Sequence, residues 1–283
     1  MTNMVSQRLI EAARMLEDVS DTPRLDAELL MAHALGLNRS ELLLRGRDLS
    51  VPASFEDMLM RRLAHEPVAY IRGYQEFWDL TLSVSPATLI PRGDSETLIE
   101  AAIAYFAGKP HPARILDLGT GTGALLLAAL SVFNGADGVA IDASGAALTV
   151  ASGNAQRLGF ADRSRFLHRS WYDEDWTHGL ERFDLILCNP PYVEMDADLA
   201  PQVRAHEPAS ALFAGEDGLN EYRHLVPQIG ALLKPEGVAI FEIGQGQDAA
   251  VTQLAAKHGF TVNMRSDLAG IVRALSISKR PGG

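Results

Sequence analysis

The sequence predicts an α/β fold in which a small helical domain precedes a doubly wound, mostly parallel sheet. After about residue 86, short apolar runs typical of buried strands alternate with helical segments, and the first run opens into a glycine-rich turn. Before that point, apolar residues recur at helical spacing. The 283 residues are enough for one large or two modest domains, each with its own core.

Composition and charge narrow the class of protein. The chain is 47% hydrophobic and 22% charged, which excludes disordered, collagenous and coiled-coil proteins. Its 25 basic and 36 acidic residues give a net charge of -11, which argues against a protein that binds by covering a phosphate backbone. The single cysteine, Cys188, cannot form an internal disulfide, and the histidines show no metal-ligand spacing, so no metal is expected.

The longest apolar stretch also argues against a membrane protein. It runs from Ala124 to Phe133. A membrane span needs roughly 18–20 apolar residues, so this stretch is too short to be one. The N-terminus lacks a basic region followed by an apolar core. We therefore expect a cytoplasmic protein with no membrane span.

The sequence predicts three consecutive parts of the chain. Residues 1–73 form a helical domain of three to five short helices, since apolar residues recur at helical spacing from Ser6 to about Leu63 between proline and glycine breaks. Residues 74–90 form a connecting hairpin or linker, because side chains alternate from Tyr74 to Val84 and Pro86 then breaks regular structure. The sheet domain covers residues 91–283.

Seven segments of the sheet domain predict strands. The last two should be strands rather than a further crossover helix, which predicts an antiparallel strand near the C-terminus. The segments are Ala113–Leu118, Gly138–Ile141, Ser164–His168, Phe183–Cys188, Gly237–Ile243, Phe260–Met264 and Ile271–Ile277.

A glycine loop follows the first of these strands and precedes a helix over Ala124–Val132. The loop consists of Gly119, Thr120, Gly121, Thr122 and Gly123. Its glycines allow the backbone to turn sharply and to approach a ligand at the positive end of a helix. The spacing alone is a weak signal, and a plain tight turn is the alternative.

Two acidic residues strengthen the ligand interpretation. Asp142 ends the next strand, about twenty residues beyond the loop, where a carboxylate can bind both hydroxyls of a ribose. Asp117 directly precedes the loop, and a buried carboxylate needs a cationic or multiply donating partner. The methionyl ammonium of S-adenosylmethionine (AdoMet) would be such a partner, so the pattern favours nucleoside binding over a tight turn with a solvated acid.

The run Asn189-Pro190-Pro191-Tyr192 follows the fourth strand, at the edge of the sheet where such folds place their chemistry. Two prolines fix the backbone and leave the Pro190 carbonyl free to accept a hydrogen bond. That carbonyl and the Asn189 side-chain oxygen can each accept one hydrogen from a planar NH2 group, and the Tyr192 ring can stack on it. An amide or aromatic amine is a poor nucleophile that needs orientation, so the run predicts an amine clamp rather than a polyproline turn.

With these motifs, the sequence resembles the class I AdoMet-dependent methyltransferases, which have a Rossmann-like sheet. Within them it resembles the PrmC or HemK family of protein-glutamine N5-methyltransferases. Further segments carry the resemblance over nearly the whole chain: Arg24–Leu30, Glu66–Gly73, Phe77-Trp78, Ser85–Arg92, Glu207-Pro208, Asp217–Leu219, Tyr222-Arg223 and Asp267–Gly270 with Arg273.

The resemblance implies a reaction: methyl transfer from AdoMet to the glutamine of the Gly-Gly-Gln motif in peptide chain release factors. S-adenosylhomocysteine would be the product, and the transfer would be direct, without a metal or a covalent enzyme intermediate. The N-terminal helices would dock the release factor, no nucleic acid would be required, and the protein would act as a monomer.

The resemblance also implies roles for individual residues. The glycine loop, Asp117, Asp142 and Asn189 would bind the cofactor, with Trp171 near its adenine and Ser170 where the family commonly has Asp. The clamp residues Asn189, Pro190 and Tyr192 would be catalytic. The substrate site would comprise these residues with Pro191 and a wall formed by Ile90, Pro91, Arg92 and Glu96.

Two other functions remain as alternatives. A nucleic-acid amine methyltransferase, acting on adenine N6 or guanine N2, would suit the same clamp. Residues 1–90 contain thirteen acidic residues, nine arginines and no lysine, which argues against a basic target-recognition region. A non-catalytic AdoMet-binding protein is the second alternative, but it would not need an amine clamp.

Overall fold

The computed structural model describes residues 4–45 and 49–280, which divide into two compact units. The helical unit comprises Met1–Tyr74 and Leu199–Glu207, and the sheet unit comprises Gln75–Asp198 and Pro208–Gly283. Residues 199–207, which come after four strands of the sheet in the sequence, thus belong to the helical unit. The predicted division into 1–73, 74–90 and 91–283 does not include this second segment.

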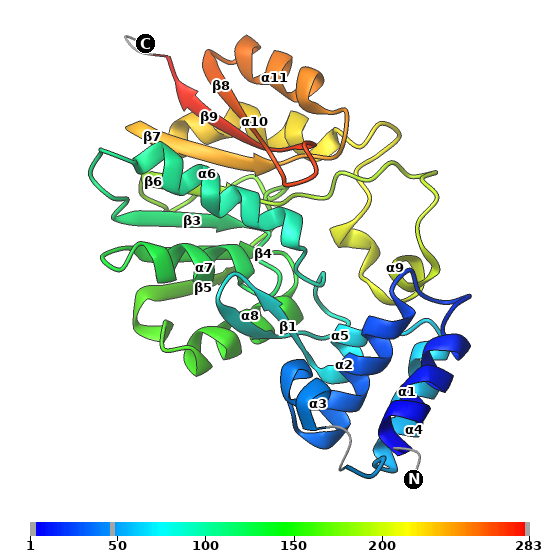
Figure 1. The fold of residues 1–283 in the computed structure, drawn as a ribbon. Helices are drawn as coiled ribbons and strands as arrows, with labels where there is room; N and C mark the ends of the chain where they lie inside the picture. The colour runs from blue at the N-terminus through cyan, green and yellow to red at the C-terminus, as the bar shows by residue number, and fades with distance from the viewer. Residues whose placement is uncertain (1–3, 46–48, 281–283) are drawn as a thin grey trace. The chain divides into compact units, whose positions relative to one another are not determined.

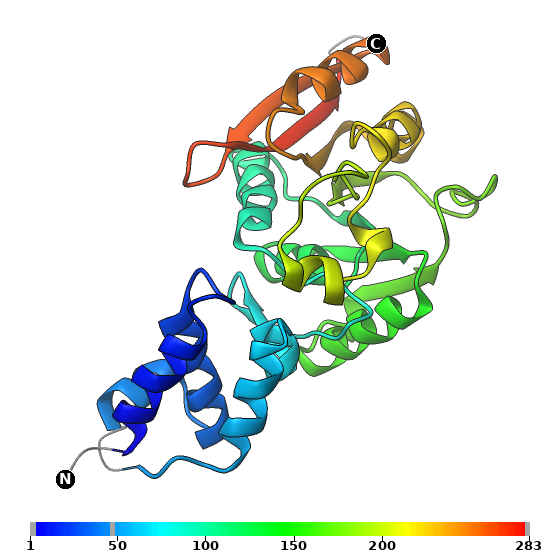
Figure 2. The ribbon, with the colours of Figure 1, turned by 90° about the vertical axis from the view of Figure 1, so that its right-hand side faces the viewer.

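The helical unit is built from short amphipathic helices, coloured blue to cyan at its N-terminal end in Figure 2. Leu9, Leu30 and Phe55 pack in its core. A buried ion pair between Arg62 Nε and Asp26 Oδ2, 2.8 Å apart, ties two of its helices together. The helices are α1 (Met4–Met15), α2 (Pro23–Leu35), α3 (Arg39–Arg45), α4 (Ser54–Leu63), α5 (Val68–Arg72) and α9 (Pro201–His206).

The sheet unit contains a seven-stranded sheet in the order β5-β4-β3-β6-β7-β9-β8. Its first five strands are parallel, and β9 pairs antiparallel with both β7 and β8, which confirms the predicted mostly parallel sheet with an antiparallel C-terminal strand. The strands are β3 (Arg114–Leu118), β4 (Asp137–Asp142), β5 (Ser164–His168), β6 (Phe183–Cys188), β7 (Leu233–Glu242), β8 (Phe260–Ser266) and β9 (Val272–Lys279).

Helices cover both faces of this sheet, and α6 and α7 lie on the face turned toward the viewer in Figure 1. Successive residues of a strand face opposite layers, as Leu185 packs with α6 and α7 while Ile186 packs with α10 and α11. This burial on both faces explains the continuous apolar runs that predict the strands. The helices are α6 (Glu96–Phe106), α7 (Ala124–Val132), α8 (Gly145–Arg157), α10 (Asn220–Leu232) and α11 (Asp248–Lys257).

Strand β7 begins at Leu233, four residues before the predicted start at Gly237. Its pairing with β6 shifts register between Phe183 and Leu185, and Pro235 lies in this irregular part. A Cβ at Gly237 would lie 2.8 Å from the Phe183 carbonyl oxygen, so the two backbones approach closely there. A proline and a glycine are typical of a bulge, which hides the first part of the strand from a pattern of apolar residues.

A two-stranded hairpin, β1 (Tyr74–Phe77) and β2 (Leu80–Ser83), precedes the sheet and confirms the predicted strands in this segment. Asn154 of α8, which is fully buried, joins β2 to the glycine loop. Its Nδ2 donates to the carbonyls of Ser83 and Thr122 at 3.0 and 2.9 Å, and its Oδ1 accepts the Ser83 N–H at 2.8 Å. The side-chain amide of Asn154 therefore holds the glycine loop to β2 through hydrogen bonds from both its nitrogen and its oxygen.

We expect Asn154→Leu to lower the free energy of unfolding by about 3 kcal/mol, because it leaves buried backbone groups of Ser83 and Thr122 without partners. Urea unfolding of the whole chain would measure the loss. The control is Gln156→Leu, an exposed position on the same helix, which should change stability little. Equal effects of the two substitutions would show that Asn154 does not support the loop.

None of the helices in the described residues is long and apolar enough to cross a membrane.

Candidate functional site

A cavity of about 370 Å³ lies at the carboxyl ends of the central strands. Strand order reverses direction between β3 and β6, and in such sheets this switch point is where ligands bind. The cavity volume is within the range of sites for small molecules and cofactors. Among the predicted site residues, the cavity is lined by Pro91, Arg92, Gly119, Thr120, Gly121, Thr122, Asp142, Trp171, Asn189 and Pro191.

The glycine loop forms one wall of the cavity. Gly119 and Gly121 have φ values of +71° and +55°, in the left-handed region that favours glycine. The N–H groups of Gly119 and Thr120 both donate to the Ile141 carbonyl, at 2.8 and 3.1 Å, which holds the turn against the end of β4. A Cβ at Gly121 would meet nothing within 4 Å, so this residue borders open space.

Asp142 lines the cavity at the end of β4, and both of its carboxylate oxygens are anchored. Oδ2 accepts the Gly121 N–H at 2.9 Å and Oδ1 accepts the Ser144 N–H at 2.8 Å. An ionised carboxylate has about four acceptor positions, so each oxygen can still accept another hydrogen bond. The geometry therefore suits the binding of two adjacent hydroxyl groups.

Trp171 lies against the glycine loop, where a Cβ at Gly119 would be 3.2 Å from its ring. Its indole Nε1 donates to Glu221 Oε2 at 2.7 Å, and the Tyr172 hydroxyl donates to Oε1 of the same carboxylate at 2.8 Å. The Trp171 carbonyl is 2.7 Å from His224 Nε2. Glu221, which sequence reasoning missed, thus fixes the orientation of an aromatic wall.

Several predicted site residues do not line the cavity. Asp117 is fully buried beneath the loop, its Oδ2 accepts the Thr120 hydroxyl at 2.6 Å, and burial raises its pKa to about 7. The Ser170 hydroxyl accepts the Tyr172 N–H at 3.2 Å instead of facing the cavity. Gly123, Pro190, Tyr192 and Glu96 are also absent from the lining, and Glu96 Oε1 accepts the Trp78 N–H at 2.7 Å. Their predicted contacts stay predictions.

Asn189 lies directly after β6 on the cavity wall. Its Nδ2 donates to the Ser95 hydroxyl at 3.3 Å, and Ser95 lines the same cavity. Ser95 is the last residue of a short 3₁₀ turn (Gly93–Ser95) that follows Pro91 and Arg92. A hydrogen bond that the sequence does not predict thus joins the clamp residue Asn189 to Ser95, which lies between Arg92 and Glu96 of the predicted wall.

Tyr192 is not among the residues that line the cavity. Its hydroxyl donates to Glu242 Oε1 at 3.2 Å, and burial together with that carboxylate raises the pKa of Tyr192 well above its usual range. A Cβ at Gly244 would lie 3.1 Å from Cδ2 of the Tyr192 ring, so the ring packs against this glycine.

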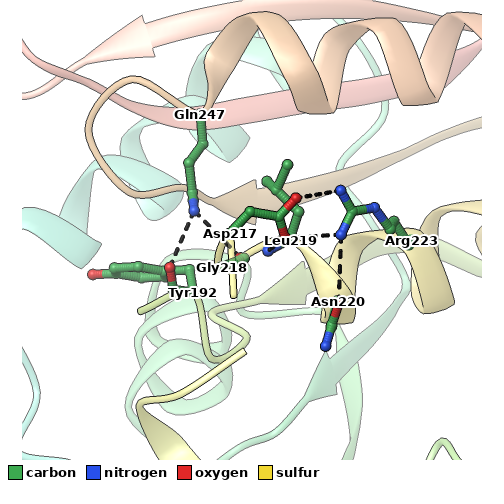
Figure 3. A network of polar contacts seen from close by, with 7 residues as sticks. All are labelled: Tyr192, Asp217, Gly218, Leu219, Asn220, Arg223 and Gln247. Atoms are coloured by element: carbon green, nitrogen blue, oxygen red, sulfur yellow. Dashed lines mark hydrogen bonds and ion pairs between the residues drawn. The ribbon is translucent and has the colours of Figure 1, made fainter. Parts of the chain in front are cut away.

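The backbone that follows the clamp is fixed by Gln247 and Gly218 (Figure 3). Gln247 Nε2 donates to the carbonyls of Tyr192 and Gly218, at 3.1 and 3.3 Å, and its Oε1 accepts the Gly244 N–H at 2.9 Å. The neighbouring turn is held by Asp217, whose carboxylate accepts hydrogen bonds from the guanidinium group of Arg223 (Figure 3). A Cβ at Gly218 would lie 2.3 Å from the Tyr192 carbonyl, so only glycine fits there.

Two family models match the chain. One is described as PrmC N-terminal domain and matches residues 7–73, and the other is described as Methyltransferase domain and matches residues 111–267.

Curated relatives match along most of their length. A release factor glutamine methyltransferase of Bradyrhizobium diazoefficiens is 41% identical, with 98% of this chain and 95% of the relative covered. The corresponding protein of Rhodospirillum rubrum is 41% identical over 93% of this chain and 81% of its own length. That of Salmonella typhimurium is 37% identical over 89% of this chain and 90% of its own length.

Solved structures of lower identity share the fold. The catalytic domain of human Mettl16 superposes with a TM-score of 0.55 at 14% identity, covering 72% of this chain and 77% of that one. A methyltransferase from Pyrococcus furiosus has a TM-score of 0.51 at 18% identity, covering 78% and 97%. These likenesses confirm the methyltransferase type of α/β fold.

Proposed function

The chain belongs to the family of release factor glutamine methyltransferases, and we propose that it methylates the side-chain amide nitrogen (N5) of the glutamine in the Gly-Gly-Gln motif of peptide chain release factors. AdoMet is the methyl donor. The observation that carries the proposal is the position of Asn189, an amide clamp residue on the wall of the cavity that the glycine loop and Asp142 also line.

The residues present fit AdoMet. The glycine loop offers backbone without side chains, Asp142 keeps acceptor positions for two hydroxyls, and Trp171 supplies an aromatic surface beside the loop. When bound, AdoMet supplies an electrophilic methyl group on a sulfonium. The residues that we propose to hold it are Gly119, Thr120, Gly121, Thr122, Asp142 and Trp171.

The clamp addresses the weak nucleophilicity of an amide nitrogen. We propose that Asn189 Oδ1 and the Pro190 carbonyl each accept one N–H of the substrate glutamine. This contact aims the nitrogen and lets it become pyramidal as the new bond forms. We propose that the proton that the methylated nitrogen gives up passes to water, since Asn189, Pro191 and Ser95, the lining residues at the clamp, carry no basic side chain. Pro91 and Arg92 would form the substrate-side wall.

The sequence also predicts that the helical unit docks the release factor and that the enzyme is a cytoplasmic monomer. The docking role is what the family resemblance implies for residues 7–73, which match the PrmC N-terminal domain. All three statements stay predictions.

The test is intact-mass analysis of an unmethylated release factor after incubation with the enzyme and AdoMet, with duplex DNA and ribosomal RNA as parallel substrates. We expect one added methyl group on the release factor, which peptide mapping places on the glutamine of Gly-Gly-Gln. An unmodified release factor beside methylated DNA or RNA would reject this substrate and favour the nucleic-acid alternative.

We expect Glu221→Leu to weaken AdoMet binding about fivefold, because it removes the acceptors of both Trp171 Nε1 and the Tyr172 hydroxyl and so releases the Trp171 ring. Calorimetric titration with AdoMet would measure the change. Tyr172→Phe is the matched control, since it removes only the Tyr172 hydrogen bond and leaves Trp171 bonded to Glu221. Unchanged affinity in Glu221→Leu would mean that the orientation of Trp171 does not matter for AdoMet.

A further inference from the structure

The side-chain amide of Gln247, in the loop between β7 and α11, connects three segments of the sheet unit (Figure 3). Its Nε2 donates to the carbonyls of Tyr192 and Gly218 at 3.1 and 3.3 Å, and its Oε1 accepts the Gly244 N–H at 2.9 Å. An amide NH2 group has two hydrogens, so each carbonyl can receive one of them. Because the Gly244 N–H can only donate, the amide oxygen must face it and the NH2 group must face the two carbonyls.

The two carbonyls belong to opposite ends of the segment between β6 and α10. Tyr192 ends the clamp run, and Gly218 lies two residues before α10. A Cβ at Gly218 would lie 2.3 Å from the Tyr192 carbonyl oxygen, and its φ is +68°, so only glycine lets the two carbonyls share one NH2 group. The segment between them contributes Pro208, Ser210 and Ala211 to the cavity lining. One amide thus holds together both ends of a segment that forms part of the cavity wall.

The clamp depends on contacts at its two ends, because its two prolines have no N–H group and cannot donate a backbone hydrogen bond. Before the clamp, Cys188 is paired in the sheet. After the prolines, the Tyr192 carbonyl accepts from Gln247, and the N–H of the next residue donates to the Leu212 carbonyl at 2.8 Å. Proline fixes φ, so a movement of the Tyr192 carbonyl is passed on to the Pro190 carbonyl.

We propose that Gln247 is a positioning residue, which fixes the direction of the Pro190 carbonyl through its hydrogen bond to the Tyr192 carbonyl. The inference rests on the proposed function, because it assumes that the Pro190 carbonyl accepts an N–H of the substrate glutamine. Gln247 is not among the residues that line the cavity, so it acts through the backbone that it holds. An acceptor that is held in place before the substrate arrives stabilises the transition state without reorganisation.

The test is Gln247→Glu, a substitution of nearly equal size. The glutamate keeps an oxygen for the Gly244 N–H, but its second oxygen has no hydrogen and is repelled by the two carbonyl oxygens that it faces. We expect kcat for release factor methylation to fall about ten- to a hundredfold, as for a misplaced reacting group. The Kd for AdoMet and the KM for release factor should change less than about threefold, because the contacts made before the transition state are kept.

The matched control is Gln245→Glu, which adds the same charge at an exposed position two residues earlier in the same loop. It should keep the wild-type kcat. The split between a lowered kcat and an unchanged AdoMet affinity separates positioning from a general loss of structure, which would lower both.

A second variant displaces the same carbonyl and keeps the glutamine. Gly218→Ala would place a Cβ 2.3 Å from the Tyr192 carbonyl oxygen and 2.7 Å from Gln247 Nε2, so their hydrogen bond must shift. We expect kcat to fall in the same way, again with an unchanged Kd for AdoMet. Gly108→Ala is its control, because the φ there is +74° and a Cβ would meet nothing within 4 Å. This control should keep the wild-type kcat, since it adds the strain of a left-handed alanine without the displacement.

The outcomes separate this inference from the proposed function. A wild-type enzyme that does not methylate the release factor would reject the proposed function, and the inference with it. If the wild type is active, the inference is wrong when Gln247→Glu keeps its kcat, or when its AdoMet affinity falls by the same factor as kcat. Should Gln247→Glu not fold, as judged by its thermal unfolding, Gln247→Met takes its place, because it removes the hydrogen bonds without adding a charge. A kcat of Gln247→Met within about twofold of the wild-type value would then overturn the inference.

Discussion

Asn189→Ala should lower kcat for release factor methylation by about 10²–10³, the loss seen when one preorganised polar contact to a reacting group is removed. The Kd for AdoMet should stay within about threefold of the wild-type value, because the contact to the substrate amide strengthens mainly toward the transition state. Single-turnover transfer from labelled AdoMet would give the rate, and calorimetry would give the affinity.

The control for this variant is Asn263→Ala, an exposed asparagine on β8, which should keep both values. The structure allows the contrast to be sharp, because Asn189 lies on the cavity wall and its side-chain nitrogen bonds only weakly to Ser95, at 3.3 Å. Thermal unfolding of Asn189→Ala should therefore match the wild type. A loss of AdoMet affinity equal to the loss of kcat would instead place Asn189 in the cofactor site alone.

Local sequence determined most of the sheet unit. Strands such as β6 are buried on both faces, so their apolar runs coincide with their boundaries at Phe183 and Cys188. The start of β7 was missed because Lys234, Pro235 and Glu236 belong to a bulged strand and interrupt the apolar pattern. The membership of α9 in the helical unit depends on contacts distant in sequence, which periodicity does not report.

The same contrast between local sequence and contacts distant in sequence explains which site residues could be predicted. The sequence predicts the glycine loop, Asp142 and Asn189 because each ends or directly follows a strand whose carboxyl end faces the cavity. Ser95, Glu221 and Gln247 were missed because each acts on a residue at least fifty positions away in the chain. Glu242 carried a signal of its own, since it is an acidic residue that ends a fully apolar run. Acidic residues at strand ends thus merit attention even when no motif contains them.

Asp142→Asn should weaken AdoMet binding by about 10²-fold, because hydrogen bonds to a charged acceptor contribute about 1.5–3 kcal/mol each. In the wild type the two carboxylate oxygens already accept the N–H groups of Gly121 and Ser144. An asparagine has one oxygen, so its NH2 group would face one of these donors and at most one ribose hydroxyl could still find an acceptor. Calorimetric titration with AdoMet and with S-adenosylhomocysteine would measure the loss.

The matched control is Asp137→Asn at the exposed start of the same strand, which should leave both affinities unchanged. At saturating AdoMet, kcat of Asp142→Asn should approach the wild-type value, since a ribose contact stabilises the ground state and the transition state equally. A low kcat that saturating AdoMet does not restore would mean that Asp142 also holds the glycine loop in its reactive shape. In that case Asp142 would support catalysis mainly through the hydrogen bond that its Oδ2 accepts from the Gly121 N–H. Its hydrogen bonds to the ribose hydroxyls would then matter less.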